Sequence, residues 1–328
     1  MLTTVLGAGS WGTALGRLLA DQGQDVRLWD IDPGPLESIN ERHENTRYLP
    51  GLPLPANLSG ELDLGRALEG AELVVLAVPS FAMREAAAAM AEHLPADALI
   101  CSVTKGVEAA TLMTMHEVLQ DVLPARHHPH LSCLSGPSFA IEVAQGLPTA
   151  VTVAAETEET ATRVQEAFYS TFFRPYTTTD VVGVEIGGCT KNVIAIACGY
   201  AAGVGFAANS AAALMTRGLE ETARLGLRRG ARPETLQGLA GVGDLVLTCS
   251  SVKSRNYRVG FGLGRGRTLS DVQAELGQVA EGVHNARSVR AMARAYDVDM
   301  PVSDAVYRLI EQGRGSDDVI AALLDTPA

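Results

Sequence analysis

Three lysines carry much of the chemistry that this sequence offers. Only Lys105, Lys191 and Lys253 are lysines among its 26 Lys and Arg residues, so arginine provides nearly all of the positive charge. An arginine keeps its proton in proteins, whereas a buried lysine can be tuned to lose one. A lysine that remains in such a composition is therefore a candidate for proton transfer.

Lys191 is the strongest candidate of the three. It is the only formally charged residue from Ile186 to Thr216. Burial beside apolar helix faces lowers the pKa of an ammonium from ~10.4. A lysine with a pKa near ~7–8 can exchange a proton with a substrate oxygen, an effect worth roughly 10²–10⁴ in rate. We expect Asp244, in a loop flanked by glycines, to orient the Lys191 ammonium. The alternative is that Lys191 snorkels from the end of a core helix.

Lys105 follows the strand expected over Leu99–Val103. Ligands collect at the carboxyl ends of parallel strands in α/β folds. A second ammonium there would polarise a substrate carbonyl and lower the pKa of Lys191 by like-charge repulsion. The alternative is a solvated loop cation.

The third lysine begins a cationic run, Lys253-Ser254-Arg255-Asn256-Tyr257-Arg258. The Arg255 guanidinium presents a planar fork to phosphate oxygens, and Ser254 and Asn256 add neutral donors. The run predicts a phosphate clamp, in which Lys253 has the weakest role. The alternative is a solvated turn.

A glycine-rich loop, Gly7-Ala8-Gly9-Ser10-Trp11-Gly12, connects an apolar strand to an amphipathic helix. This context is the one that the G-x-G-x-x-G fingerprint requires. Gly7 permits the tight turn, Gly9 lets the backbone approach a pyrophosphate, and Gly12 lets the helix pack closely on the strand. The helix N-terminus presents N–H groups to the phosphates. The loop therefore predicts a dinucleotide site.

The second strand ends at Asp30, where the fingerprint expects the acid that bonds the ribose 2′-OH. A carboxylate there repels a 2′-phosphate, and no arginine is adjacent in Asp30-Ile31-Asp32. The sequence therefore favours NAD(H) over NADP(H). Arg27 and Arg47 are the cations that could still support NADP(H).

Around this loop, short apolar runs alternate with helical patterns. We expect strands at Leu2–Leu6, Val26–Asp30, Leu73–Val78, Leu99–Val103, Leu131–Leu134 and Ala150–Ala154, and helices at Trp11–Ala20, Phe81–His93 and Glu156–Ser170. Continuous apolar strands separated by helices are typical of a parallel sheet that is covered on both faces. The segment Pro33–Pro55 interrupts this pattern as a Pro-rich excursion with a short helix.

After about residue 180 the pattern becomes helical and Ala-rich. Helices are expected at Val184–Tyr200, Ser210–Leu225, Arg232–Ala240, Leu269–Leu276, Val283–Tyr296 and Val302–Glu311. The predicted fold class is α/β: a Rossmann-like, doubly wound, mostly parallel sheet domain over residues 1–180, followed by an all-α C-terminal domain over residues 181–328.

The composition of the chain limits the classes of binding partner. The 328-residue chain has a net charge of −12, which repels polyanions, so nucleic acid and anionic membrane are poor partners. The apolar stretch Val193–Phe206 is short for a membrane span, which needs ~20 residues. The five cysteines form no C-x-x-C pair, and neither they nor the histidines suggest a metal site. Reduced thiols and the lack of a signal-peptide pattern predict a cytoplasmic protein.

Further segments occur in order along nearly the whole chain. They are Arg47-Tyr48-Leu49-Pro50-Gly51, Lys105-Gly106-Val107-Glu108, Gly136-Pro137-Ser138-Phe139-Ala140, 185–192, 241–245, Ser254-Arg255-Asn256 and 278–282. With the glycine loop, this combination closely resembles the bacterial-type NAD(P)-dependent sn-glycerol-3-phosphate dehydrogenase family.

The resemblance implies a cytoplasmic enzyme that interconverts sn-glycerol 3-phosphate and dihydroxyacetone phosphate and supplies the former for phospholipid synthesis. A homodimer is plausible for the family. Lys191 matches the proton-transferring lysine. Substrate contacts are implied for Lys105, Gly136, Ser138, Lys191, Asp244, Ser254, Arg255 and Asn256. Cofactor contacts are implied for Ser10, Trp11, Ala140, Arg255, Val279 and Glu281, and Lys105 and Tyr48 complete the candidate set.

The sequence departs from this family near Asp30, and two other functions are alternatives. Many relatives carry a basic residue near Asp30, so NADP(H) use is in doubt here. Lysine-dependent dehydrogenases of the β-hydroxyacid or 6-phosphogluconate type place an asparagine four residues after the lysine, but Ala195 holds that position and Asn192 comes next. A non-catalytic dinucleotide sensor on the same fold would need neither paired lysines nor a phosphate clamp.

Overall fold

The computed structural model describes residues 1–313. The chain forms two compact units. The first contains Met1–Thr104 and Met115–Val181, and the second contains Lys105–Thr114 and the described residues from Val182 onward. The segment that begins at Lys105 thus leaves the first unit and packs with the second. This differs from the expected first domain over residues 1–180, because pattern alone cannot show which core a short loop joins.

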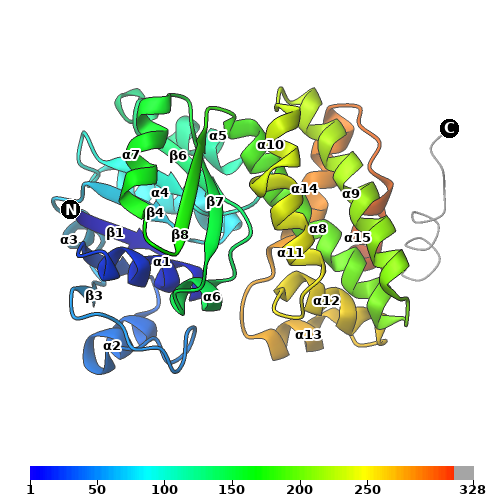
Figure 1. Ribbon diagram of the computed structural model, residues 1–328, viewed down its shortest axis with the longest axis horizontal. Coiled ribbons are helices and arrows are strands. Elements are labelled where there is room, and N and C mark those ends of the chain that lie inside the picture. Colours follow the sequence, from blue (N-terminus) through cyan, green and yellow to red (C-terminus); the bar gives the residue numbers. More distant parts are fainter. Residues whose placement is uncertain (314–328) are drawn as a thin grey trace. The chain divides into compact units, whose positions relative to one another are not determined.

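The first unit is built on one eight-stranded sheet in the order β3-β2-β1-β4-β5-β6-β7-β8 (Figure 1). Its strands are β1 (Leu2–Leu6), β2 (Asp25–Trp29), β3 (Leu58–Gly60), β4 (Leu73–Leu76), β5 (Leu99–Ser102), β6 (Leu131–Ser135), β7 (Thr149–Ala155) and β8 (Phe173–Thr178). All neighbours pair in parallel except β6 and β7. The predicted mostly parallel, Rossmann-like sheet is confirmed.

The order of the strands fixes where a ligand can bind. The chain leaves β1 toward β2 on one side, and β4 pairs with β1 on the other. The strand order therefore reverses beside β1, and ligands of such sheets bind at the carboxyl ends of the strands at this switch point. The glycine loop directly follows β1.

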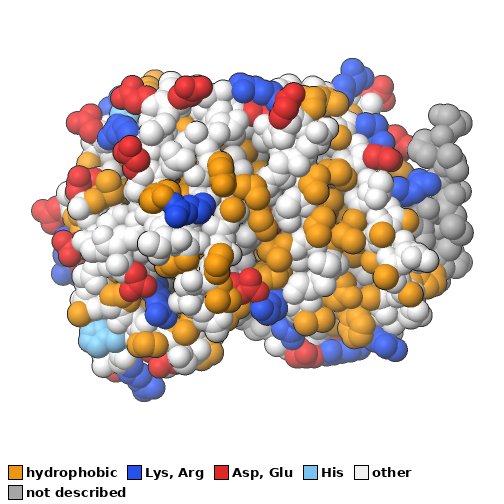
Figure 2. Space-filling model, viewed as in Figure 1, with side chains coloured by type: hydrophobic (Ala, Val, Ile, Leu, Met, Phe, Trp, Pro, Cys, Tyr) orange, Lys and Arg blue, Asp and Glu red, His pale blue; other side chains and the backbone are white. Residues whose placement is uncertain are grey.

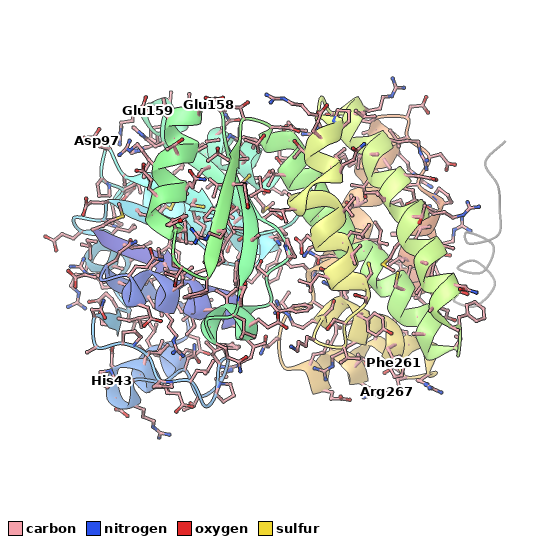
Figure 3. All side chains as sticks on the ribbon, in the orientation of Figure 1. His43, Asp97, Glu158, Glu159, Phe261 and Arg267 are labelled. Carbon is pink, nitrogen blue, oxygen red and sulfur yellow. The ribbon has the colours of Figure 1, made fainter. Side chains whose placement is uncertain are left out.

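Helices surround this sheet. They are α1 (Ser10–Asp21), α2 (Pro33–Arg42), α3 (Leu64–Leu68), α4 (Met83–Ala91), α5 (Met115–Val122), α6 (Ala140–Ala144) and α7 (Glu158–Phe168), with 3-10 turns at Ser80–Ala82 and Ala125–His130. The apolar strands are buried because helices cover them; all four residues of β4 are buried. Pro33–Pro55 contains α2, which ends at Arg42 and is followed by its C-cap residue His43, labelled in Figure 3. His43 has a left-handed conformation (φ 51°).

The described part of the second unit is helical. Its helices are α8 (Val181–Gly203), α9 (Ala208–Arg228), α10 (Pro233–Gln237), α11 (Asp244–Cys249), α12 (Arg255–Gly264), α13 (Leu269–Leu276), α14 (Glu281–Ala295) and α15 (Pro301–Gln312), with a π-helical turn at Leu239–Gly243. The first residue of α8 belongs to the first unit by packing. The expected all-α domain is confirmed over these residues.

The helix α8 is long and apolar enough to cross a bilayer by composition alone. However, 94% of its most apolar window is buried inside the protein. It is the central helix of a core that includes Ile194, Leu214 and Val289. Burial by protein accounts for its apolarity.

The sequence missed some elements. β3 and β8 were not expected, and neither were the helices α3, α5, α6, α11 and α12. Asp244 was expected in a loop, and this was wrong: it is the first residue of α11. The two glycines that flank it belong to the preceding π-helical turn, and glycine-rich sequence in helical backbone is a weak helix signal.

The cysteines and potential metal ligands are also defined. All five cysteines lie within residues 1–313 and are buried, and none forms a disulfide. In that part of the chain, no group of three or more His, Cys, Asp or Glu side chains is placed to hold a metal ion.

Candidate active site

The glycine loop has the geometry that a dinucleotide requires. Gly7 has φ of +109°, and a Cβ there would lie 2.7 Å from Ala77 O. A Cβ on Gly12 would lie 1.9 Å from Gly7 O, whereas a Cβ on Gly9 would meet nothing within 4 Å. Gly7 and Gly12 therefore allow the turn and the close packing of α1, and Gly9 leaves open space in front of the backbone.

The N-terminus of α1 is suited to an anion. Its N-cap is Gly9, no side chain caps it, and no acidic residue lies in its first turn. Its first N–H groups and positive dipole end thus face no protein carboxylate of that turn. The loop and the helix together fit the pyrophosphate of NAD(P)(H).

The Pro-rich excursion is fastened to this loop. The buried Asn45 side chain donates from Nδ2 to Ala8 O (2.8 Å) and to Thr13 Oγ1 (2.8 Å). Its Oδ1 accepts from Tyr48 N (3.1 Å), and Ser10 Oγ donates to Tyr48 O (2.7 Å). Two of the predicted cofactor residues, Ser10 and Tyr48, are thereby brought together.

Two further predicted cofactor residues lie at the same place. Trp11 and Ala140 pack against one small apolar cluster that contains the buried Ala14 and Leu49. The neighbouring turn after β6 holds the predicted substrate residues Gly136 and Ser138, in which Ser138 Oγ donates to Gly136 O (2.9 Å).

Asp30 has a role in the loop itself. Its Oδ2 accepts from Ala8 N (2.7 Å) and its Oδ1 from Asp32 N (3.0 Å). The carboxylate therefore fixes the glycine loop at the end of β2. It keeps unused lone pairs for a ribose hydroxyl, because an ionised carboxylate has about four acceptor sites.

The second unit contains the predicted lysine pair around one carboxylate. Lys191 Nζ lies 2.5 Å from Asp244 Oδ1, and Lys105 Nζ lies 2.6 Å from Asp244 Oδ2. The Asp244 side chain is 1% exposed, that of Lys191 9% and that of Lys105 16%. The three residues predicted to be catalytic thus form a single buried cluster, and Lys191 is not a snorkelling lysine.

The pKa values in this cluster follow from burial and charge. Burial is the largest influence on Lys191, and with the neighbouring charge of Lys105 it outweighs the attraction of Asp244 and lowers the pKa of Lys191 to about 7. Burial alone would raise the pKa of Asp244, but the two ammonium groups outweigh it and hold this pKa below its usual value. Asp244 is therefore an anion near neutral pH, beside a lysine that can change its protonation.

Close helix contacts put these residues together. A Cβ on Gly187 would lie 2.5 Å from Ala240 O, so only glycine lets α8 approach the turn before α11. Lys191 projects one turn further along α8, and Asp244 opens α11.

Thr248 belongs to the cluster and was missed. Lys191 Nζ donates to Thr248 Oγ1 (3.0 Å), and this hydroxyl donates to Asp244 O (2.6 Å). Thr248 is buried. Its spacing of four residues from Asp244 would have been a signal had α11 been recognised, since such residues share a helix face.

Three asparagines connect the segments of the two lysines with α12 and α14. Asn285 donates from Nδ2 to Lys105 O (3.2 Å). Asn256 donates from Nδ2 to Asn192 Oδ1 (2.8 Å) and accepts at Oδ1 from Gly282 N (2.9 Å). Asn256 was expected in the phosphate clamp, but its amide is buried and engaged within the protein. Asn285 had no sequence signal beyond its type, and Asn192 was noted only as the residue that follows Lys191.

The remaining clamp residues differ in role. Ser254 is buried and caps α12, accepting from Tyr257 N (3.2 Å). Arg255 is exposed, and its Nη1 donates to Gln278 Oε1 (3.4 Å). This bond brings Arg255 to the segment that carries Val279 and Glu281. Arg255 is the first residue of α12, whose N-terminus Ser254 caps and whose first turn contains no acidic residue.

Comparison with known proteins agrees with both units. Residues 3–161 match the family described as NAD-dependent glycerol-3-phosphate dehydrogenase N-terminus, and residues 180–321 match the corresponding C-terminus. A protein of Anaeromyxobacter sp. (strain K) named glycerol-3-phosphate dehydrogenase [NAD(P)+] is 57% identical over 99% of this chain and 98% of its own. One of Myxococcus xanthus with the same name is 48% identical over 99% and 97%.

A crystal structure gives the same result. That of glycerol-3-phosphate dehydrogenase from Coxiella burnetii superposes with a TM-score of 0.92 at 39% identity, covering 98% of this chain and 97% of the other. The chain belongs to the NAD-dependent glycerol-3-phosphate dehydrogenase family.

Proposed function

We propose that this protein interconverts sn-glycerol 3-phosphate and dihydroxyacetone phosphate with NAD(P)(H). The observation that carries the proposal is the buried Lys191, bonded to Asp244 and Thr248, with a pKa lowered to about 7. A general acid–base works best when its pKa lies near the operating pH. The names of relatives at 57% and 48% identity support the same reaction.

Lys191 handles the proton at the C2 oxygen. The neutral amine accepts the hydroxyl proton when glycerol 3-phosphate is oxidised, and the ammonium returns one when the ketone is reduced. Asp244 and Thr248 hold Nζ in place through both states. The Lys105 ammonium polarises the same oxygen and keeps the pKa of Lys191 low. The bound nicotinamide supplies or accepts the hydride.

The substrate phosphate binds at Arg255. Its guanidinium is exposed at the N-terminus of α12, where helix N–H groups also favour an anion. Ser254 shapes this terminus as its cap rather than as a direct ligand. In the first unit, the Gly136 and Ser138 turn is proposed as a further substrate contact.

The dinucleotide binds at the glycine loop, with Ser10, Trp11, Tyr48 and Ala140 around it. NAD(H) is favoured, because Asp30 and Asp32 place negative charge at the end of β2. Lys105, Arg255, Val279 and Glu281 are proposed as contacts from the second unit.

The setting of the reaction is also proposed. Buried thiols without disulfides suit a reducing cytoplasm, and the net charge of −12 disfavours polyanionic partners. On the face shown in Figure 2, Lys and Arg side chains are interspersed with acidic ones. We propose a cytoplasmic homodimer that acts on a small phosphorylated substrate and supplies glycerol 3-phosphate for phospholipid synthesis.

One assay tests the reaction against its rivals. NADH absorbance is followed with dihydroxyacetone phosphate, with 6-phosphogluconate and NAD⁺, and without substrate. We expect NADH to be consumed only with dihydroxyacetone phosphate. Turnover of 6-phosphogluconate would favour the other lysine-dependent type, and NADH binding without turnover of any substrate would favour a sensor.

A further inference from the structure

The end of β2 carries an ion pair that sequence spacing did not reveal. Arg47 Nη1 lies 2.5 Å from Asp32 Oδ2, with the arginine side chain 57% exposed and the aspartate 39% exposed. Asp32 follows Asp30, the residue at the ribose 2′ position of Rossmann folds. A guanidinium is therefore held two residues from the position that distinguishes NAD(H) from NADP(H).

The backbone that carries this arginine is fixed, although its head group is not buried. Asn45 and Ser10 bind the flanking Tyr48 to the glycine loop through hydrogen bonds of 3.1 and 2.7 Å. The Arg47 guanidinium lies 5.0 Å from the centroid of the Tyr48 ring. The backbone of Arg47 is thus held close to the cofactor loop, whereas its long side chain is exposed and can change its conformation.

The other candidate cation is committed elsewhere. Arg27 lies on β2, but its Nη1 donates to Arg66 O (2.7 Å) and Glu69 O (2.8 Å). Two backbone carbonyls on and after α3 therefore hold it. Of Arg27 and Arg47, the two arginines that could support NADP(H), only Arg47 remains as a candidate.

We propose that Arg47 receives the 2′-phosphate of NADP(H), and that Asp32 restrains it and so sets the preference for NAD(H). An exposed ion pair is weak, whereas an arginine fork on a phosphate is a strong, charge-assisted contact. A 2′-phosphate can thus draw Arg47 away from Asp32. The phosphate then lies near the carboxylates of Asp30 and Asp32, and their repulsion reduces the affinity for NADP(H). The inference rests on the proposed binding of a dinucleotide at the glycine loop.

Asp32→Asn separates restraint from folding. Asp32 also caps α2, where its Oδ1 accepts from Gly34 N (3.0 Å), and asparagine caps a helix as well as aspartate does. The variant removes the negative charge of Asp32, which both holds Arg47 and repels the 2′-phosphate. We expect the Kd for NADPH, measured by isothermal titration calorimetry, to fall roughly tenfold, with the Kd for NADH nearly unchanged.

Arg47→Gln tests the phosphate contact itself. We expect the Kd for NADPH to rise roughly ten- to hundredfold while that for NADH changes little. In the double variant Asp32→Asn/Arg47→Gln, most of the gain from Asp32→Asn should disappear, because that gain acts through Arg47. The matched control is Arg84→Gln, which removes the same charge from a 2.6 Å ion pair with Asp121 on α4 and α5.

The outcomes are distinct. Loss of NADPH affinity in Arg47→Gln alone, together with a gain in Asp32→Asn, supports the inference. An unchanged NADPH to NADH ratio in Arg47→Gln, or an equal loss in Arg84→Gln, overturns it and leaves the proposed function intact. If the unaltered protein binds neither dinucleotide, the proposed function fails and the inference fails with it.

Discussion

Lys191 Nζ lies 2.5 Å from Asp244 Oδ1, although 53 positions separate the two residues in the chain. Lys105 takes the other oxygen of the same carboxylate at 2.6 Å. One buried anion thus holds two ammonium groups, and the shared carboxylate offsets only part of their mutual repulsion and desolvation. The lowered pKa of Lys191 results from this arrangement.

Replacement of Lys191 should abolish proton transfer without loss of cofactor. In Lys191→Met, we expect kcat to fall by about 10²–10⁴, with the Kd for NADH nearly unchanged, because the glycine loop lies in the other unit. Steady-state kinetics and NADH titration measure the two effects. Full turnover in this variant would remove Lys191 from the mechanism.

Removal of the Lys105 charge should move the pH profile. Lys105 lowers the pKa of Lys191, which is about 7 in the native protein, so in Lys105→Met that pKa should rise. Ketone reduction needs the protonated lysine. As pH rises, kcat/KM for reduction should therefore decrease with a midpoint of about 7 in the native protein and with a higher midpoint in the variant.

The control for this shift is Lys253→Met. It removes a lysine that is exposed, unlike the buried Lys191, so its profile should follow the native one. A profile in Lys105→Met that keeps the native midpoint would contradict the proposed coupling of the two lysines.

The Thr248 hydroxyl should matter for turnover more than for folding. Thr248→Val keeps the shape but removes the bond to Lys191 Nζ, and we expect kcat to fall about tenfold. Thr248→Ser restores the hydroxyl and should recover most activity. Ser250→Ala removes a comparable hydroxyl bond at the C-cap of the same helix, to Val246 O, and should leave kcat unchanged; an equal loss there would point to α11 in general.

Arg255 should select for the phosphate. Arg255→Gln is expected to raise the KM for dihydroxyacetone phosphate roughly ten- to hundredfold and to reduce discrimination against dihydroxyacetone, with Tm unchanged because the side chain is exposed. Arg258→Gln is the control, since Arg258 lies on the same helix and pairs with Glu275. Retained selectivity in Arg255→Gln would place the phosphate elsewhere.

A stability prediction concerns Glu221, a buried carboxylate outside the proposed mechanism. It accepts from Val302 N (2.5 Å), Ser303 N (3.1 Å) and Ser303 Oγ (2.9 Å) at the N-terminus of α15. Glu221→Ala leaves these donors unsatisfied and should reduce the free energy of unfolding by about 1–3 kcal/mol. Glu221→Gln keeps one acceptor and should lose less in urea denaturation; equal stability of Glu221→Ala and the native protein would contradict this capping role.

The local pattern predicted most of the strands and helices and the kind of chemistry that they carry. Four apolar residues in a row specify a strand covered on both faces, as in β4, and the strand–glycine–helix context specifies the dinucleotide loop. The scarcity of lysine pointed to Lys191 and Lys105. These inferences depend on neighbours within a few residues or on overall composition, and the sequence displays both directly.

Tertiary structure decided which residues meet. It placed Lys105 with the helical unit, made Asp244 the start of a helix, added Thr248, and bonded Asn256 to Asn192. It also set Arg47 against Asp32. Each of these contacts joins separate elements whose approach depends on packing, such as the contact of Gly187 with Ala240 O, and packing distances of this kind are not encoded in the periodicity of either segment.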